Sequence, residues 1–311
     1  MIYTLTVNPS LDYVIKLKNF EAGGIYRTNE EELIYGGKGV NVSVMLHNLG
    51  IESLALGFVA GDTGILYESG LRATGIRTSF LSVSEGMTRI NVKISSDDET
   101  EINGQGSRPT EEDLEKMKAR LALLKQGDIL VVSGSVQKCI PDAFYAQIVR
   151  EANRNGVLCV VDTSGAPLLH VLEEKPFLIK PNIQELEEIF QCPMREGLLL
   201  SSMQAIQQKG VRNVLVSCGE KGAYLLDERG AFLYGTSLQG KVVSTVGCGD
   251  AMVAGSMYGW LKAGDYEEAF RMAIAAGGAT AFTNGIAGGK AVQKVIDDVK
   301  IEVMRPANGS Q

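Results

Sequence analysis

The sequence predicts an α/β protein in which helices cover both faces of a mostly parallel central sheet and a small second sheet is inserted. From about residue 105 onward, apolar β-rich runs alternate with helical patterns, which is typical of a parallel sheet buried on both sides. Residues 12–34 and 79–104 instead show period-two alternation without good helices. The 311 residues are 45% apolar, which is enough to bury a full-sized core.

The main domain is expected to comprise residues 1–11, 35–78 and 105–311, with a first strand that ends in a turn. After residue 105 the predicted order is helix, strand, helix, strand, strand, helix and strand. These elements cover residues 111–125, 128–132, 141–155, 157–161, 177–180, 183–190 and 213–217, in that order. The tail after Arg305 is expected to fray.

The two inserted segments, 12–34 and 79–104, are expected to form a small antiparallel sheet. In the strand predicted over residues 88–94, apolar and polar side chains alternate between the two faces. A two-aspartate turn at 97–98 then leads into a returning strand. A half-exposed sheet of this kind suits a lid or a dimer surface, and its uncovered edge favours a homodimer.

Charge and composition exclude several classes of function. The chain carries 30 basic and 37 acidic residues, and this net charge of −7 disfavours general nucleic-acid binding. No apolar run is long enough to span a membrane, and the N-terminus lacks the basic start of a signal peptide, so we expect a cytoplasmic protein. Two histidines without an HExxH pattern exclude a zinc hydrolase, and five cysteines without C-x-x-C spacing are expected to be reduced thiols.

The strongest chemical signal is Thr245-Val-Gly-Cys-Gly-Asp250, just before a long apolar helix. The N–H groups and dipole of the helix start suit an anion, and the glycines let a phosphate approach the backbone. Asp250 adds like charge there, which makes sense if it accepts the proton of a hydroxyl that attacks a phosphoryl group. The alternative is a glycine-rich loop with Asp250 as the helix N-cap. The pattern is neither a Walker A loop nor GxGxxG.

A second glycine run, Gly36-Gly-Lys-Gly-Val-Asn41, also opens a helix. Lys38 suits an anion and Asn41 suits sugar hydroxyls, although a glycine turn with a solvated lysine has the same pattern. Asp12 follows the first strand, at the sheet edge where α/β proteins bind ligands, but turn chemistry explains the preceding Asn-Pro-Ser equally well. Arg89 is either a phosphate contact or a surface arginine.

Two further motifs follow predicted strands. Lys180-Pro-Asn-Ile-Gln-Glu185 places Asn182 and Glu185 at the same sheet edge, where Glu185 could reach Mg²⁺ through water; a capping box explains the same spacing. Ser217-Cys-Gly-Glu-Lys-Gly222 suits the backbone site of an adenosine nucleotide, or a plain hairpin. All these motifs fall at strand ends or helix starts and suit a phosphate, a sugar or Mg²⁺, and this consistency favours a binding site.

Together the motifs resemble those of the ribokinase superfamily. Residues 36–41 and 245–250 resemble its two sugar-kinase signatures and residues 180–185 its magnesium-associated motif, in matching order over essentially the whole chain. With residues 8–12 and 88–93 added, the chain resembles the phosphofructokinase B branch. The resemblance implies a ribokinase-like three-layer α/β/α sandwich with a β-sheet lid, which often forms a dimer clasp. It also implies ATP, Mg²⁺ and a sugar phosphate as ligands.

The resemblance assigns roles to individual residues. Asp250 is the implied base, and the N–H groups of Gly247, Cys248 and Gly249 are the implied anion hole. The implied sugar-phosphate positions are Asp12, Gly37, Lys38, Gly39, Asn41, Arg89 and Ser135. The implied ATP positions are Lys180, Asn182, Ser217, Cys218, Gly219, Glu220, Lys221, Gly222, Gly249 and Asp250, with Glu185 beside Mg²⁺. Cys248 departs from the alanine or serine usual in the family, and a thiol there is a candidate for oxidation.

The lid pattern at residues 88–93 and 99–104 resembles that of enzymes acting on fructose 1-phosphate. The implied reaction is ATP-dependent phosphorylation of fructose 1-phosphate at its 6-hydroxyl, with tagatose 6-phosphate as the alternative acceptor. A sugar-phosphate sensor that uses the fold without catalysis is the alternative from a different class. Retention of Asp250, Lys38 and Glu185 together argues against the sensor.

Overall fold

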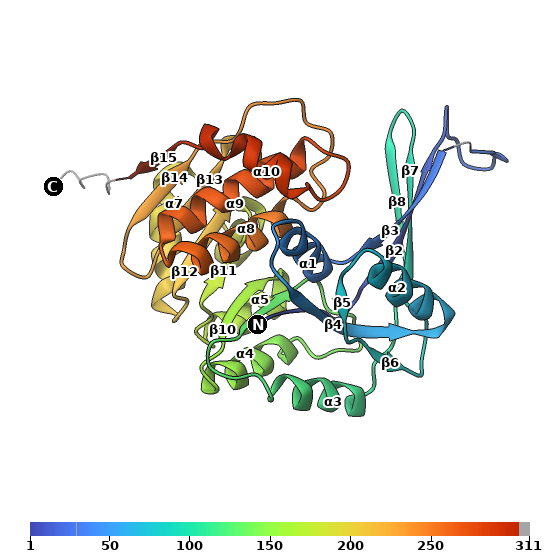
Figure 1. Cartoon of the computed structure of the whole chain (residues 1–311), viewed down its shortest axis with the longest axis horizontal. Helices are drawn as coiled ribbons and strands as arrows, with labels where there is room; N and C mark the ends of the chain where they lie inside the picture. The colour runs from blue at the N-terminus through green and yellow to red at the C-terminus, as the bar shows by residue number, and fades with distance from the viewer. Residues whose placement is uncertain (29, 305–311) are drawn as a thin grey trace.

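The computed structural model in Figure 1 describes residues 1–28 and 30–304. Residue 29, inside one predicted lid segment, and the tail expected to fray after Arg305 lie outside the described residues. No helix in the described ranges is long and apolar enough to cross a membrane.

The main sheet has eleven strands in the order β15-β14-β13-β12-β11-β10-β9-β1-β4-β5, with β6 also paired to β4. Every pairing from β5 to β12 is parallel, and those from β12 to β15 are antiparallel, which confirms the predicted mostly parallel sheet. The strands are β1 (Ile2–Thr6), β4 (Ser53–Ala60), β5 (Arg77–Thr78), β6 (Leu81–Val83), β9 (Ile129–Ser133), β10 (Leu158–Asp162), β11 (Leu178–Ile179), β12 (Asn213–Ser217), β13 (Ala223–Leu226), β14 (Phe232–Gly235) and β15 (Ile301–Val303).

Helices cover both faces of this sheet, as Figure 1 shows. Strand side chains such as Leu130 and Val132 pack with α3 to α7 in one apolar cluster. The alternate side chains, such as Ile129 and Val131, pack with α1, α8, α9 and α10 in another, so the core has three layers. The helices are α1 (Lys38–Asn48), α2 (Gly61–Ala73), α3 (Glu111–Leu121), α4 (Phe144–Arg154), α5 (Gly165–Leu172), α6 (Ile183–Phe190), α7 (Glu196–Gln208), α8 (Cys248–Ala263), α9 (Tyr266–Ala281) and α10 (Gly289–Val295).

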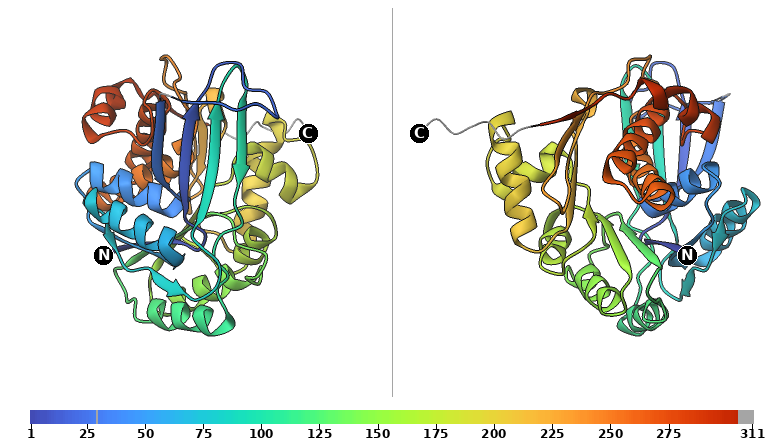
Figure 2. Two further views of the ribbon diagram at one scale, coloured as in Figure 1. Left: turned by 90° about the vertical axis from the view of Figure 1, so that its right-hand side faces the viewer. Right: turned by 60° about the vertical axis from the view of Figure 1, so that its left-hand side comes forward.

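The second sheet is built from the segments predicted as a lid, and we keep that name for it. Its strands β2 (Ser10–Lys16), β3 (Glu30–Gly36), β7 (Arg89–Ser95) and β8 (Glu99–Asn103) lie side by side in the order β3-β2-β7-β8 (Figure 2). The central pair β2 and β7 is parallel, so the antiparallel prediction is wrong for it. Both strands leave the main domain in the same direction, β2 directly after β1 and β7 after β6. Strand β6 itself pairs with β4, so this part of the predicted lid belongs to the main sheet.

Candidate active site

Four segments that are distant in sequence meet at the carboxyl ends of the central parallel strands. Asn41, in the first turns of α1, donates its side-chain amide to Asp250 Oδ2 over 2.8 Å. The ammonium groups of Lys38, at the start of α1, and Lys180, just after β11, each lie 3.4 Å from Oδ1 of Asp162, the last residue of β10. Ligands of open α/β sheets bind at this edge, so the structure assembles a candidate site where the fold predicts one.

Helix α8 begins with Gly247 at the N-cap, in the left-handed region at φ +80°, and places Asp250 at the third helical position. Asp250 is therefore not the N-cap, and the alternative based on capping is wrong. A Cβ atom at Gly249 would lie 2.8 Å from Lys180 Nζ, so the absence of a side chain lets this cation approach the helix start. The N–H groups of the first helical turn have no intrahelical acceptor, which makes this end of α8 suited to an anion.

The carboxylate of Asp250 is 5% exposed. Burial and the negative charge of Asp162 raise its pKa to about 6, against the hydrogen bond from Asn41 and the charges of Lys38 and Lys180, which lower it. Burial also lowers the pKa of Lys38, but Asp162, Asp250 and Glu185 outweigh this effect, so its pKa is raised overall and the ammonium stays charged. The site thus joins a carboxylate that can hold a proton near neutral pH to two cations.

Asp162 is the charged member of this cluster that the sequence analysis missed. It is 1% exposed, and its Oδ2 atom has no hydrogen-bond partner among the described residues. The signal was present, because Asp162 ends an apolar strand just as Asp12 follows the first one, but nothing around it matched a recognised motif.

The sugar-phosphate candidates divide between the core and the lid. On the lid, Asp12 Oδ1 accepts the Asn91 amide at 2.8 Å, and its Oδ2 lies 3.2 Å from Lys93 Nζ. Arg89 shares that face, and its Nε atom is buried without a partner in the described structure. Burial lowers the pKa of Arg89, and the charge of Asp12 opposes this shift. Because a buried donor without a partner is costly, the Nε atom suits an anionic ligand. Asn91 and Lys93 were not predicted as site residues.

The core side of the sugar site is built from glycine-rich backbone. A Cβ atom at Gly37 would lie 2.8 Å from Thr6 Cγ2, and one at Gly39 would lie 2.6 Å from Thr6 Oγ1, so α1 can start against β1 only with glycine at both positions. Ser135 is exposed in the loop after β9, one residue beyond Gly134, which packs near Lys38.

The nucleotide candidates lie along the next strands of the sheet. Asn182 forms an isolated parallel bridge with Ser217, which brings the two predicted motifs together. After Ser217 the chain makes a short 3₁₀ turn over Gly219–Lys221 and returns as β13, so this motif is also the hairpin of the alternative interpretation. Gly222 is at φ +87°, and a Cβ atom there would meet the carbonyl oxygen of Gly235 at 2.1 Å. The Glu220 and Lys221 side chains are exposed, whereas Lys180 is buried.

The capping box predicted as an alternative for residues 182–185 is present. The Asn182 N–H donates to Glu185 Oε2 at 2.9 Å, and the Glu185 N–H donates to Asn182 Oδ1 at 2.8 Å. The box engages one carboxylate oxygen, and the charge of Glu185 still acts on Lys38. A single carboxylate fits Mg²⁺ only if other ligands, such as nucleotide phosphates and water, hold most of the ion. No cluster of three or more acidic, histidine or cysteine ligands exists in the described chain.

The two thiols of the candidate site resist ionisation. Burial raises the pKa of Cys218 to about 11, and burial with the charge of Asp250 raises that of Cys248 to about 11. The thiolate is the reactive form, so this environment opposes the oxidation suggested for Cys248. The Cys248 sulfur lies 3.8 Å from the Ser244 carbonyl oxygen, so the thiol does not occupy the backbone N–H groups at the helix start.

Comparison with known proteins identifies this arrangement. Residues 6–290 match the model of the pfkB family carbohydrate kinases. The chain belongs to this family. The predicted resemblance is therefore confirmed, and the chain is a phosphotransferase that phosphorylates an alcohol group of a carbohydrate.

Named relatives of this pfkB family kinase extend over nearly its whole length. It is 38% identical over 308 residues to the 1-phosphofructokinase of Bacillus subtilis (strain 168), which covers 97% of this chain and 99% of the relative. It is 36% identical over 289 residues to the D-tagatose-1-phosphate kinase of Bacillus licheniformis, covering 92% and 94%. A crystal structure of a putative phosphofructokinase from Staphylococcus aureus superposes with a TM-score of 0.88 at 38% identity, covering 98% and 99%, which confirms the ribokinase-like fold with its second small sheet.

Proposed function

We propose that this kinase transfers the γ-phosphoryl group of ATP to the 6-hydroxyl of fructose 1-phosphate, giving fructose 1,6-bisphosphate. The observation that carries the proposal is the buried carboxylate of Asp250 in the first turn of α8. It accepts a hydrogen bond from Asn41 of α1, and Lys180 and Lys38 lie nearby. Phosphoryl transfer depends on positioning and charge stabilisation, and this cluster supplies a proton acceptor, helix-start N–H groups and two cations in one place.

In this mechanism Asp250 accepts the proton of the 6-hydroxyl as its oxygen attacks the γ-phosphorus. The N–H groups of Gly247, Cys248 and Gly249 stabilise the charge that develops on the phosphoryl oxygens. Lys38 lies against Asp162 rather than against the lid, so we assign it to the transferred phosphoryl group. Its implied role as an anchor of the sugar phosphate then falls to Arg89.

At the other end of the sugar, Arg89 binds the 1-phosphate and Asp12 accepts hydrogen bonds from the sugar hydroxyls. The buried Arg89 Nε without a partner supports the anion contact. Asn41, Gly37, Gly39 and Ser135 complete this side of the site. Fructose 1-phosphate is favoured over other acceptors because the relative at 38% identity is a 1-phosphofructokinase.

We assign the ATP site to Lys180, Asn182 and the turn from Ser217 to Gly222. The bridge between Asn182 and Ser217 makes them one continuous surface at the sheet edge. Glu185 is the residue that would hold Mg²⁺, through water. When bound, Mg²⁺ would supply charge neutralisation on the ATP phosphates.

D-Tagatose 1-phosphate is the second candidate acceptor, because the relative at 36% identity is a D-tagatose-1-phosphate kinase. The two sugars are epimers with the same phosphate and the same free 6-hydroxyl. The implied roles of Asp250 and Arg89 therefore hold for both, and the choice depends on how Asp12 and its neighbours bind the ring hydroxyls.

The test is the initial rate with Mg-ATP and four acceptors: fructose 1-phosphate, tagatose 1-phosphate, tagatose 6-phosphate and fructose 6-phosphate. We expect kcat/KM for fructose 1-phosphate to exceed the others by about tenfold, which is about 1.4 kcal/mol of discrimination. A preference for either tagatose phosphate would contradict the assigned acceptor and leave the kinase chemistry intact. Tight binding of one sugar phosphate without turnover of any would favour the sensor.

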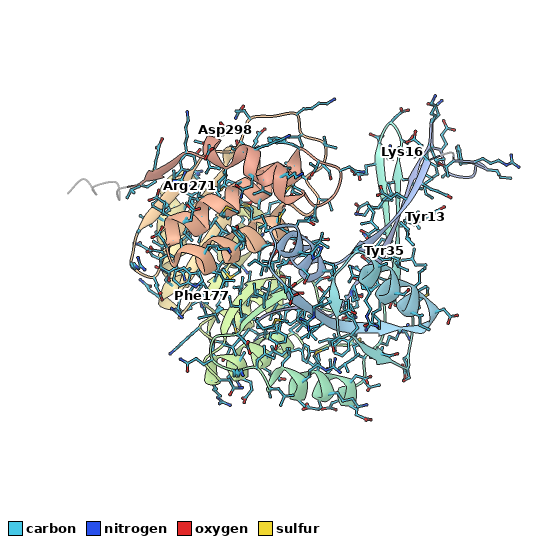
Figure 3. All side chains as sticks on the ribbon, in the orientation of Figure 1. Tyr13, Lys16, Tyr35, Phe177, Arg271 and Asp298 are labelled. Carbon is cyan, nitrogen blue, oxygen red and sulfur yellow. The ribbon has the colours of Figure 1, made fainter. Side chains whose placement is uncertain are left out.

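We also propose that the protein is cytoplasmic and that two copies associate through their lids as a homodimer. The lid face that carries Tyr13, Leu33, Ile90 and Ile102 is apolar, and three of these side chains are exposed, at 38%, 38% and 60% for Leu33, Ile90 and Ile102. Tyr13 is labelled on the lid in Figure 3, at a distance from the helical layer that carries Arg271. An uncovered apolar sheet face is a liability that a second copy removes.

A further inference from the structure

One carboxylate oxygen of Asp162 lies near the ammonium groups of two lysines. Lys38 and Lys180 both lie 3.4 Å from Oδ1, whereas a committed charge-assisted hydrogen bond is about 2.7–2.9 Å long. Oδ2 is buried and has no partner among the described residues, so the two lysines are the counter-ions of this carboxylate. A buried acceptor without a hydrogen bond is costly, and sites that keep one commonly have a function.

The location of the two lysines shows what this arrangement serves. Lys180 is almost fully buried, and its ammonium lies where a side chain at position 249 would be, against the first turn of α8. Lys38 comes from a different element, the first turn of α1, which also carries the Asn41 that donates to Asp250. Without Asp162, two ammonium groups would repel each other beside the helix start and separate.

We propose that Asp162 is a positioning residue that holds Lys38 and Lys180 together at the start of α8. From there both ammonium groups can move to the oxygens of the transferred phosphoryl group. The long contacts keep both lysines in place before the substrates bind and release them when phosphate oxygens arrive. Asp162 does not touch the reacting atoms in this mechanism, and no metal contact is assigned to it. The inference rests on the proposed kinase function.

The first experiment compares Asp162→Asn with Asp227→Asn, a matched substitution of a buried carboxylate that accepts the N–H groups of Arg229 and Ala231 away from the site. We expect Asp162→Asn to lower kcat by about 10–100-fold with the best acceptor. KM for ATP should fall severalfold, because the variant keeps two cations and loses an anion near the triphosphate. Asp227→Asn should leave both constants within twofold of wild type.

A pH profile separates positioning from a structural role. The charged or titratable groups around Asp250 are Lys38 from α1, Asp162 from β10, Lys180 after β11 and Cys248 on its own helix, with Glu185 of α6 acting on Lys38. Asp162→Asn should move the acid limb of kcat/KM to lower pH, because it removes a negative charge that raises the pKa of Asp250. Lys180→Met should move the limb to higher pH. A variant that only loses folded protein shows a lower rate at every pH, and its acid limb stays at the wild-type position.

A double-mutant cycle tests whether Asp162 acts through the lysine. The cost of Asp162→Asn should be several-fold smaller in a Lys180→Met background than in the wild type. An equal cost in both backgrounds, an unmoved acid limb, or a kcat within twofold of wild type in Asp162→Asn would overturn the proposal.

Two further arms keep the inference testable if the first variant or the proposed function fails. If Asp162→Asn does not fold, Asp162→Glu keeps the charge and displaces the lysines, so its kcat should fall while its acid limb stays; a wild-type kcat would overturn the proposal. If the wild-type protein turns over none of the four acceptors, the proposed function fails. Calorimetry with ATP then decides, because Asp162→Asn should bind ATP more tightly, and unchanged or weaker affinity would overturn the role of Asp162.

Discussion

At the scale of single residues, the site is a set of buried charges that compensate one another. Asp250 and Asp162 are both nearly inaccessible, and the buried Lys180 and partly buried Lys38 balance them. The balance leaves Asp250 with a pKa of about 6, so the carboxylate is ionised at neutral pH and still basic enough to take a proton.

Asp250→Asn should lower kcat by about 10²–10⁴-fold, because the amide cannot accept the hydroxyl proton. ATP affinity, measured by calorimetry, should not weaken by more than threefold, because the helix-start N–H groups remain and the substitution removes an anion near the triphosphate. Near-normal turnover would remove Asp250 as the base. Asp227→Asn is the control for neutralising a buried carboxylate.

The raised pKa of Asp250 also predicts two pH effects. The base must be deprotonated, so kcat/KM should fall about tenfold per pH unit below about pH 6. Stability depends on pH in the opposite direction to activity. The pKa of Asp250 is higher in the folded than in the unfolded protein, so its ionised form destabilises the fold at high pH. Asp250→Asn should therefore raise the free energy of unfolding by on the order of 2 kcal/mol at pH 8. Urea titrations should show this gain vanish near pH 4, and a gain independent of pH would contradict the buried charge.

Arg89→Ala should raise KM for fructose 1-phosphate by about 10–100-fold and change kcat by less than about threefold, because the proposed phosphate contact is the same in ground and transition states. Arg77→Ala is the matched control, since Arg77 pairs with Glu52 on the surface. Steady-state kinetics that showed equal KM values for the two variants would remove Arg89 as the anchor.

At the scale of secondary structure, close packing of α8 on α9 determines where Asp250 lies. A Cβ atom at Gly255 would meet the Met272 carbonyl at 2.3 Å, and one at Gly259 would meet the Ala269 Cα at 2.7 Å. The helices approach closely because these positions have no side chain, and the approach fixes the start of α8 against Lys180 and Asn41.

Gly255→Ala should therefore lower the free energy of unfolding by about 1–3 kcal/mol, and lower kcat by shifting α8. Gly197→Ala, in α7 with nothing near its Cβ position, should be neutral or stabilise by up to about 1 kcal/mol. Chemical denaturation and kinetics of the two variants check this. Equal stabilities would show that the α8–α9 contact can relax.

The lid strands act as a unit on Asp12. Asn91 and Lys93 of β7 hold its two oxygens, and the Asn91 side chain in turn accepts the Gly104 N–H at the end of β8. The parallel pairing of β2 with β7 produces this contact, because it places residue 12 opposite residue 91 on one face of the sheet.

At the scale of the whole molecule, the lid strands project from the main domain (Figure 1). One face of the lid carries the exposed apolar side chains of Leu33, Ile90 and Ile102. We expect light scattering to give the mass of a dimer at micromolar concentration. Ile102→Glu should convert it to a monomer, because it buries a charge in the proposed interface. Leu123→Glu, an equally drastic change at a side chain 81% exposed outside the lid, should leave the dimer intact. A monomeric wild type, or a dimer in both variants, would contradict the lid interface.

Local patterns determined most of the fold. The helix predicted over 183–190 and the strand predicted over 213–217 agree with α6 and β12, because periodicity and capping are local properties. The helix predicted from Pro141 begins three residues later, at Phe144. The pairing of β2 with β7 was missed, because pairing direction depends on where distant strands leave the core.

The sequence by itself determined the fold class and singled out Asp250, Lys38, Asn41, Arg89 and Glu185 as polar groups at strand ends and helix starts. These follow from glycine-rich turns and hydrophobic periods that are read along the chain, whereas the family followed from the resemblance of the motifs. Only the tertiary structure decided that Asp162 lies between Lys38 and Lys180, that Lys93 and Asn91 hold Asp12, and that Asp250 is buried enough to have a raised pKa. Burial and charge coupling arise between residues from different elements, 79 positions apart for Asp12 and Asn91 and 209 for Asn41 and Asp250, and no local pattern records the distance at which the fold places them.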